Sequence, residues 1–286
     1  MQHWKIILTY DGTPFHGWQI QPGLPTVQGT LAHAIAHVTG ETVLPQGSGR
    51  TDTGVHALAQ VATFPLAAPI PGPNLHRALN RALPSSIRIL TVSPVPPGFH
   101  ARHSALRKTY EYRIFPRTAP SQPVDPAAAQ NTADRICSPM LAPFVWDCPW
   151  PLDLGRMQHA APHILGEHDF TSFAASDPDL TTRTSTPDPD PDPDLDQKKD
   201  AIRFISESTW QQKDELFLYR VTGSGFLHHM VRNLVGTFVD IGAGRLSPDA
   251  ISSILAARNR SAAGPTAPAR GLFLVSVDYP AVGDLS

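Results

Sequence analysis

The chain has 286 residues, a net charge of −2 and only two cysteines, Cys137 and Cys148. A chain of this length can bury one large core or two joined cores. Two cysteines are too few for a disulfide framework, and no stretch approaches the roughly 20 apolar residues of a membrane span. The N-terminal residues also lack the long apolar run of a signal peptide. We therefore expect a cytoplasmic protein that binds no membrane.

The negative charge is concentrated in one segment. Residues 177–200 hold eight aspartates against Arg183, Lys198 and Lys199; without them the acidic residues fall from 25 to 17, the basic residues fall from 23 to 20, and the net charge becomes +3. The Asp-Pro repeat in this region predicts disorder over residues 176–200, because proline removes backbone donors and like charges repel. The rest of the chain is mildly basic, which permits an anionic partner.

The first part of the chain predicts the element order β-α-β-α-β-β. Alternating apolar residues predict a strand over 3–12, and apolar residues at helical spacing predict a helix over 25–40 with Thr26 as N-cap and Gly40 at its end. A strand over 55–64, a short helix over 73–84 capped by Asn74, and strands over 86–95 and 107–115 follow. This order is typical of a mixed α/β fold.

The second part predicts further strands with two consecutive helices. Residues 116–140 read as an irregular insertion, 151–166 as a helix with Asp153 near its start, and 201–223 as a β-hairpin turning at residues 211–214. Residues 225–244 predict an amphipathic helix, a helix follows over 248–258, and a strand closes the chain over 271–280. The buried stripe of the amphipathic helix would consist of Leu227, Val231, Leu234, Val235, Phe238 and Ile241.

The stretch GSGRTDTGVHA at residues 47–57 is the strongest candidate for chemistry. Asp52 lies in a glycine-bracketed loop between a predicted helix and a predicted strand, where reactive groups are often presented. It reads either as a nucleophile or as a turn-capping carboxylate paired with Arg50. Tyr110 and Tyr112 share one strand face, and each reads either as core or as a ring for stacking on a base.

Two groups of histidines raise the question of a metal site. His159, His163 and His168 with Asp169 straddle a predicted helix end, and His33 and His37 lie four residues apart on a helix. A zinc site needs three or four convergent ligands, and the pair His33 and His37 lacks the acidic base of a zinc protease beside it. We therefore expect no metal.

Seven blocks in chain order resemble the bacterial tRNA pseudouridine synthase A family. They are LTYDGTPFHGWQIQP, TVQGTL, GSGRTDTGVHA, FHARHSALRKTYEYRI, GEHDFTSF, HHMVRNLVG and APARGLFLVSVDYP. The resemblance runs along most of the chain and is interrupted by the Pro/Ala-rich insertion and the Asp-Pro tract. The chain is identified as a member of this family on these blocks.

The resemblance implies a role for five residues. Asp52 matches the family's nucleophile, Arg50 the residue that displaces the target base, and Tyr110 the ring that stacks on the target uracil. Arg232 matches a salt-bridge partner of the aspartate, and Leu272 an apolar wall of the pocket. An arginine beside a buried carboxyl lowers its pKa by roughly 1–3 units, which would offset desolvation.

The resemblance further implies the reaction, the substrate and the architecture. Uridine is isomerised to pseudouridine at tRNA positions 38, 39 and 40 in the anticodon stem-loop, without a cofactor or metal, by a homodimer. The implied fold is α/β: two similar halves form a continuous mixed, mainly antiparallel sheet flanked by helices, with a basic RNA-binding cleft between them. We expect the halves to comprise residues 1–106, carrying the catalytic loop, and residues 107–286. Arg77, Arg81, Arg102, Arg107 and Lys108 are candidate phosphate contacts.

The chain departs from the family pattern after DFTSF. The family continues there with a basic residue, whereas here Ala174 is followed by the Asp-rich tract. Eight aspartates beside the cleft would repel a phosphate backbone. The departure leaves two alternatives open: an RNA-binding protein of the same fold, or a synthase acting on other RNA sites.

Overall fold

The computed structural model describes residues 1–118, 135–175 and 201–280. Within them the chain forms two compact units, one of Met1–Tyr110 with Leu272–Ser286 and the other of Glu111–Gly271. The Asp-Pro tract and most of the expected insertion over 116–140 lie outside the described residues. The division into functional halves at residue 106 stays a prediction.

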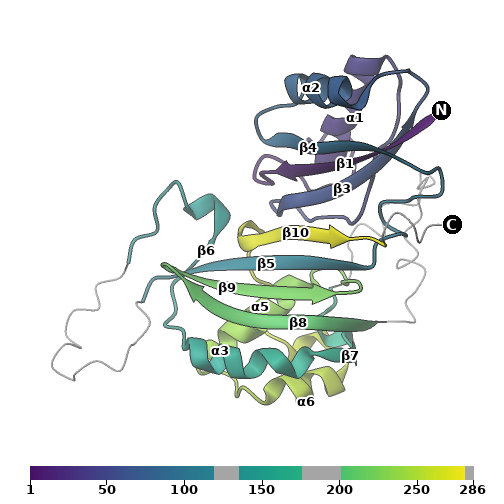
Figure 1. Ribbon diagram of the computed structural model, residues 1–286. Helices are drawn as coiled ribbons and strands as arrows, with labels where there is room; N and C mark the ends of the chain where they lie inside the picture. The colour runs from purple at the N-terminus through teal and green to yellow at the C-terminus, as the bar shows by residue number, and fades with distance from the viewer. Residues whose placement is uncertain (119–134, 176–200, 281–286) are drawn as a thin grey trace. The chain divides into compact units, whose positions relative to one another are not determined.

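The first unit is a four-stranded sheet with two helices. Its strand order is β4 (Ile87–Val95), β1 (Gln2–Tyr10), β3 (His56–Leu66), β10 (Leu272–Asp278), and the two-residue β2 (Gln46–Gly47) pairs with β3. The pairs of β1 with β3 and with β4 are antiparallel, whereas β10 runs parallel to β3. Helices α1 (Val27–Thr39) and α2 (Gly72–Ala82) pack together, and α2 lies on β4 (Figure 1).

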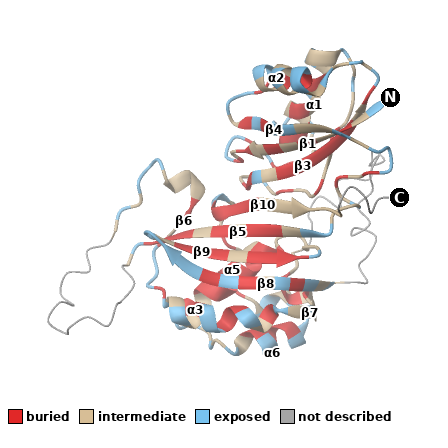
Figure 2. Cartoon of the chain, viewed as in Figure 1, coloured by how far each residue is buried: buried red, intermediate tan, exposed pale blue. Residues whose placement is uncertain are grey.

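Strand β1 shows why this unit folds as it does. Its alternating residues Trp4, Ile6, Leu8 and Tyr10 are buried, so one face of the sheet becomes core (Figure 2). The expected caps of α1 are confirmed, since the Thr26 side chain accepts from the Gly29 N–H and Gly40 ends the helix in the left-handed conformation.

The second unit is built on the strand order β5 (Arg107–Pro116), β9 (Leu216–Gly223), β8 (Ile202–Lys213), β7 (Gly166–Asp169), with β6 (Trp146–Cys148) parallel to β5. Helix α3 (Leu154–Ala160) packs on β8 and on α5 (Met230–Gly242), and α6 (Ala250–Ala257) lies against the short 3₁₀ segments Ala161–Ile164 and Thr171–Phe173. Figure 1 shows these helices gathered beside β9 and β8. The expected mixed α/β class with mainly antiparallel strands is thus confirmed.

Three predicted boundaries are wrong. Helix α2 begins at Gly72 after Pro71, so Asn74 lies inside it, where its side chain accepts from Arg77. The β8–β9 hairpin turns at Asp214 and Glu215, because Lys213 pairs with Leu216 and Asp214 takes the left-handed conformation.

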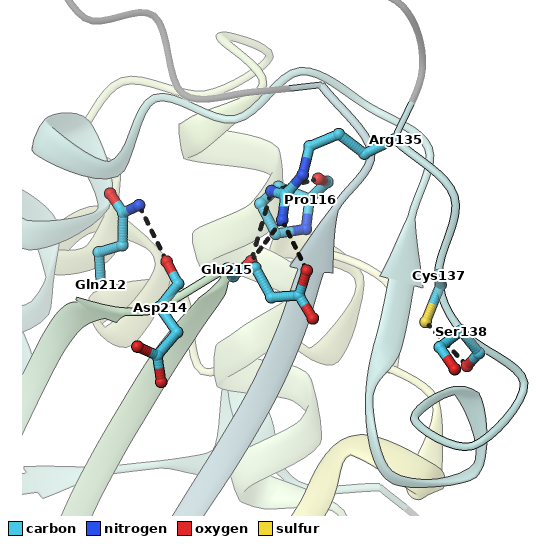
Figure 3. Close-up of polar contacts among 7 residues, drawn as sticks. All are labelled: Pro116, Arg135, Cys137, Ser138, Gln212, Asp214 and Glu215. Carbon is cyan, nitrogen blue, oxygen red and sulfur yellow. Dashed lines mark hydrogen bonds and ion pairs between the residues drawn. The ribbon is translucent and has the colours of Figure 1, made fainter.

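Figure 3 shows why the hairpin turn is held there. Arg135 donates to the Glu215 backbone oxygen at 3.4 Å and forms an ion pair with its carboxylate at 3.2 Å, and it also donates to the Pro116 oxygen at the end of β5. Arg135 and Glu215 are 80 residues apart in the chain, so the local sequence does not predict that they fix the turn.

The third wrong boundary is the start of α5. The helix begins at Met230, after His229 in a left-handed conformation, so Leu227 lies outside it. Eleven of its 13 residues are buried, so burial extends well beyond the single stripe expected from the sequence.

Candidate active site

The loop that carries Asp52 is fastened to the sheet at its start. It leaves β2, and the Ser48 N–H donates to the Val61 oxygen at 2.8 Å. The buried side chain of Gln60 on β3 accepts from the Ser48 hydroxyl at 2.6 Å and donates to the Gly49 oxygen at 2.9 Å. The backbone leading to Asp52 is therefore held by β3 itself.

A second loop, between β1 and α1, contacts the backbone of Thr51 and Val55. The Trp18 N–H donates to the Thr51 oxygen at 3.0 Å. Gly17 has a φ of +81°, and a Cβ there would stand 2.6 Å from that oxygen. A Cβ on Gly12 would overlap the Val55 oxygen. Only glycine permits this close approach, which fixes the path of the Asp52 backbone.

The side chains beside Asp52 are phenolic and hydroxylic. The Tyr10 hydroxyl lies 2.8 Å from the Thr51 hydroxyl, and both residues are buried. Burial raises the pKa of Tyr110 well above its usual range, and interactions with the nearby Tyr10 and Asp52 side chains raise it further. The structure thus brings Tyr110 within electrostatic reach of Asp52 and keeps its phenol neutral.

His56 and Asp11 form a further contact that sequence reasoning missed. His56 Nδ1 lies 3.0 Å from the Gly12 N–H and 3.2 Å from an Asp11 oxygen. A backbone N–H is always a donor, so Nδ1 accepts from Gly12 and cannot donate to the carboxylate. The buried ring stacks on Phe273, and His56 therefore pins the turn after β1 to β3 and β10.

The other expected site residues of the first unit lie around this loop. Arg50 is half-buried two residues before Asp52. Leu272 is buried at the start of β10. The next residue, Phe273, pairs with His56 at the start of β3, so Leu272 lies beside that end of β3. Lys108 also approaches the loop, since a Cβ on Gly49 would lie 3.1 Å from its Nζ.

Arg232 belongs to the second unit, in the first turn of α5. Its Nε donates to the Ala267 oxygen at 2.8 Å, and its own backbone oxygen accepts from the Ala267 N–H at 3.1 Å. Tyr112 is fully buried, and its hydroxyl donates to the Pro268 oxygen at 2.7 Å. Of the two tyrosines left undecided by the sequence, Tyr112 is therefore core.

The histidine groups considered as metal ligands are only partly brought together. His168 contacts the Leu165 oxygen, and Asp169 accepts from Thr171 and forms an ion pair with Arg258. His159 and His163 instead lie with Asp249, and the three candidate ligand atoms are all within 4.8 Å of one another. The group weighed from the sequence, with His168 and Asp169, is therefore not brought together, and the carboxylate beside His159 and His163 comes from 86 residues beyond His163.

Comparison with known proteins gives a consistent result. A family model described as tRNA pseudouridine synthase matches residues 6–104 and 193–280. A protein named tRNA pseudouridine synthase A from Solibacter usitatus is 46% identical over 279 residues, which cover 98% of this chain and 100% of that protein. A protein of the same name from Rhodospirillum centenum is 41% identical, and the match covers 98% of this chain and 100% of that protein. Another from Maridesulfovibrio salexigens is 40% identical, and the match covers 99% of this chain and 92% of that protein. Within the parts of the chain that the structure describes, no helix is long and apolar enough to cross a membrane.

Proposed function

This chain belongs to the tRNA pseudouridine synthase family, and we propose that it isomerises uridine to pseudouridine in tRNA with Asp52 as the nucleophile. The observation that supports this role most directly is the setting of Asp52. Its loop is held by buried hydrogen bonds from β3 and by glycines of a second loop, with a neutral tyrosine beside it. A turn-capping aspartate needs none of these features.

The proposed reaction follows from the residues in the first unit. The Asp52 carboxylate attacks the sugar C1′ or an electron-poor carbon of the uracil ring, and the N-glycosidic bond breaks. The detached uracil turns and its C5 forms a bond to C1′, while the bond to the Asp52 carboxylate breaks and frees the carboxylate. The hydrogen on C5 leaves as a proton, and N1 of the uracil takes up a proton. Because Tyr110 keeps its phenol proton, it offers a neutral ring for stacking on the uracil.

The base must first leave its stack, at a cost of a few kcal/mol. We assign the displacement of the base to Arg50, which shares the Asp52 loop, and an apolar wall of the pocket to Leu272. For Arg232 the support is the resemblance of HHMVRNLVG to the family motif, which gives it the role of charge partner for the nucleophile.

We further propose positions 38, 39 and 40 of the anticodon stem-loop as targets, a homodimeric enzyme, a cytoplasmic location, and a reaction without a cofactor or metal. These proposals rest on the resemblance of the sequence blocks. Carbodiimide treatment of the modified tRNA followed by reverse transcription would map the targets as stops at those positions, and light scattering would give the mass of the assembly. Stops elsewhere would favour a synthase for other RNA sites.

The decisive experiment measures tritium release from tRNA that carries 5-tritiated uridine, because forming the C5–C1′ bond expels that hydrogen. Wild type should release tritium, and Asp52→Ala should lower the rate by at least about a thousandfold, since a covalent nucleophile has no substitute in the loop. The matched control is Asp147→Asn, which removes the carboxylate that forms an ion pair with Arg117 in the second unit.

Each outcome has one meaning. Release by Asp52→Ala at the wild-type rate would reduce Asp52 to a turn residue. Binding of tRNA by the wild type without release from any tRNA would favour the RNA-binding protein. Loss of release in Asp147→Asn as well would show that the assay responds to folding rather than to the nucleophile.

A further inference from the structure

A cluster of two imidazoles and one carboxylate lies on the second unit, and the reaction proposed above uses none of its members. His159 comes from the end of α3, His163 from the 3₁₀ segment that follows it, and Asp249 from the residue before α6. One candidate ligand atom of each lies within 4.8 Å of the other two, and His163 Nε2 is 3.9 Å from an Asp249 oxygen.

These distances are close to those of an occupied site. Imidazole nitrogens and carboxylate oxygens lie about 2.0–2.2 Å from a bound zinc ion, so two ligands of one tetrahedral ion are about 3.3–3.6 Å apart. The His163–Asp249 pair, at 3.9 Å, must close by about 0.5 Å, and no pair must close by more than about 1.5 Å. His159 and Asp249 are exposed, so a small side-chain rotation achieves this without moving the core.

Two further contacts support a metal-binding role. His163 Nδ1 lies 3.4 Å from the Ser252 hydroxyl of α6. This oxygen can accept from the Nδ1–H of the tautomer whose Nε2 lone pair is free to bind a metal ion. Asp249 precedes α6, yet in the described structure its carboxylate does not cap the helix. It is directed instead toward His163, as a ligand would be.

We propose that His159, His163 and Asp249 bind one divalent transition-metal ion, with Zn²⁺ as the best match to an N₂O donor set. Water would complete the coordination, since the three residues supply three ligands. A bound ion would connect the end of α3 to the start of α6, next to the place where α6 lies against Ala161–Ile164. The site is therefore structural and separate from the Asp52 chemistry.

The test uses the full chain, treated with chelator and then titrated with Zn²⁺ while binding and thermal unfolding are measured. We expect one equivalent to bind with micromolar or tighter affinity and to raise Tm. His163→Gln and Asp249→Asn should each weaken this first equivalent by about tenfold or more. The matched control is His33→Gln, which removes one histidine of the pair spaced four apart on α1 and should leave the first equivalent unchanged.

A second measurement makes the result independent of folding. Co²⁺ in place of Zn²⁺ should give visible absorption bands typical of nitrogen and oxygen ligands, and these should be lost in His163→Gln. The metal-free forms of wild type and variants should share one Tm, which shows that the variants fold. If no equivalent binds below about 100 µM Zn²⁺, or if His163→Gln and Asp249→Asn bind like wild type, the proposal is wrong. Either result leaves tritium release by the wild type unaffected.

Discussion

At the scale of single residues, a pair of buried hydroxyls on Tyr10 and Thr51 lies next to Asp52. Their oxygens are 2.8 Å apart, and Thr51 is the residue bonded to Asp52 in the chain. Burial raises the pKa of Tyr10 well above its usual range, so its proton stays available for this hydrogen bond. The pair therefore sets the orientation of the peptide that carries the nucleophile, and Tyr10 acts as a positioning residue.

The prediction is that Tyr10→Phe lowers kcat by about threefold to tenfold with little change in KM for tRNA, because a net hydrogen bond of about 0.5–1.5 kcal/mol is lost. Thr51→Val should give a similar loss, since it keeps the volume and removes the hydroxyl. Thr51→Ser should restore most of the activity, because it keeps the hydroxyl. The measurement is steady-state tritium release with each variant.

The double variant Tyr10→Phe/Thr51→Val provides the control. If both residues act through one hydrogen bond, its kcat should be close to that of either single variant rather than to the product of the two losses. The two hydroxyls do not act as a pair if KM rises as much as kcat falls, or if the loss of kcat in the double variant equals the product of the two single losses.

The sequence pattern makes some residues candidates without deciding their roles. Asp52 and Arg50 lie in a glycine-rich loop and Tyr110 on an alternating strand, and the role proposed for each comes from the resemblance. Gln60 and His56 were not identified, because their significance comes from contacts with Gly49 and Gly12 that no spacing predicts. Tyr10 was read only as an apolar strand residue.

At the scale of elements, helix α5 depends on a glycine at its centre. A Cβ on Gly236 would overlap the Pro265 carbonyl oxygen, so the segment around Pro265 crosses the helix in direct backbone contact. The adjacent Gly264 N–H donates to the Thr237 hydroxyl at 2.9 Å, and Asn233 accepts from Thr266 at 2.6 Å. The crossing is therefore a packed junction that connects α5 to the segment leading to β10.

We predict that Gly236→Ala destabilises the protein by about 1–3 kcal/mol or more, although alanine is the better helix former, because backbone must move to admit the methyl group. The matched control is Gly98→Ala, where a Cβ meets nothing within 4 Å. Urea unfolding should show a lower midpoint for Gly236→Ala and an unchanged midpoint for Gly98→Ala. Equal midpoints would mean that the crossing segment yields at little cost.

The elements that the sequence predicts well have a periodic apolar pattern over many residues and capping residues at their ends. Helix α1 has apolar residues at helical spacing, Thr26 before it and Gly40 after it, and its bounds match the expectation within two residues. The short strands β2, β6 and β7 were not predicted, because two to four residues carry no period and form only where a longer strand offers a partner. The predicted helix over 151–166 is α-helical only to Ala160 and continues as 3₁₀ helix with Pro162 in it.

At the scale of the whole molecule, pairing between distant segments decides which residues fold together. Strand β10, at the end of the chain, joins the first unit because it runs parallel to β3, more than 200 residues earlier. The local pattern of β10 indicates a strand but not its partner. Composition and periodicity indicate only the order of elements, and the halves expected from the resemblance place this strand with residues 107–286.

Charge is the second property that belongs to the whole molecule. The chain is −2 overall, and the eight aspartates within residues 177–200 account for the negative sign, since the remainder is +3. A tRNA phosphate backbone attracts that remainder and is repelled by the aspartates, and both effects are screened by salt. We therefore expect the acidic segment to weaken tRNA binding most at low salt, where its charges are screened least.

The prediction is that deleting residues 177–197, which removes seven aspartates and Arg183, leaves Tm and tritium release intact and tightens tRNA binding several-fold at low salt. The difference in Kd should vanish at high salt, because the Debye length falls from about 10 Å at 0.1 M to about 3 Å at 1 M. A chain of full length with those seven aspartates changed to asparagine separates charge from length and should bind like the deletion. A fall in Tm or in turnover in the deletion alone would assign the segment a structural role, and weaker tRNA binding in either variant would overturn the electrostatic argument.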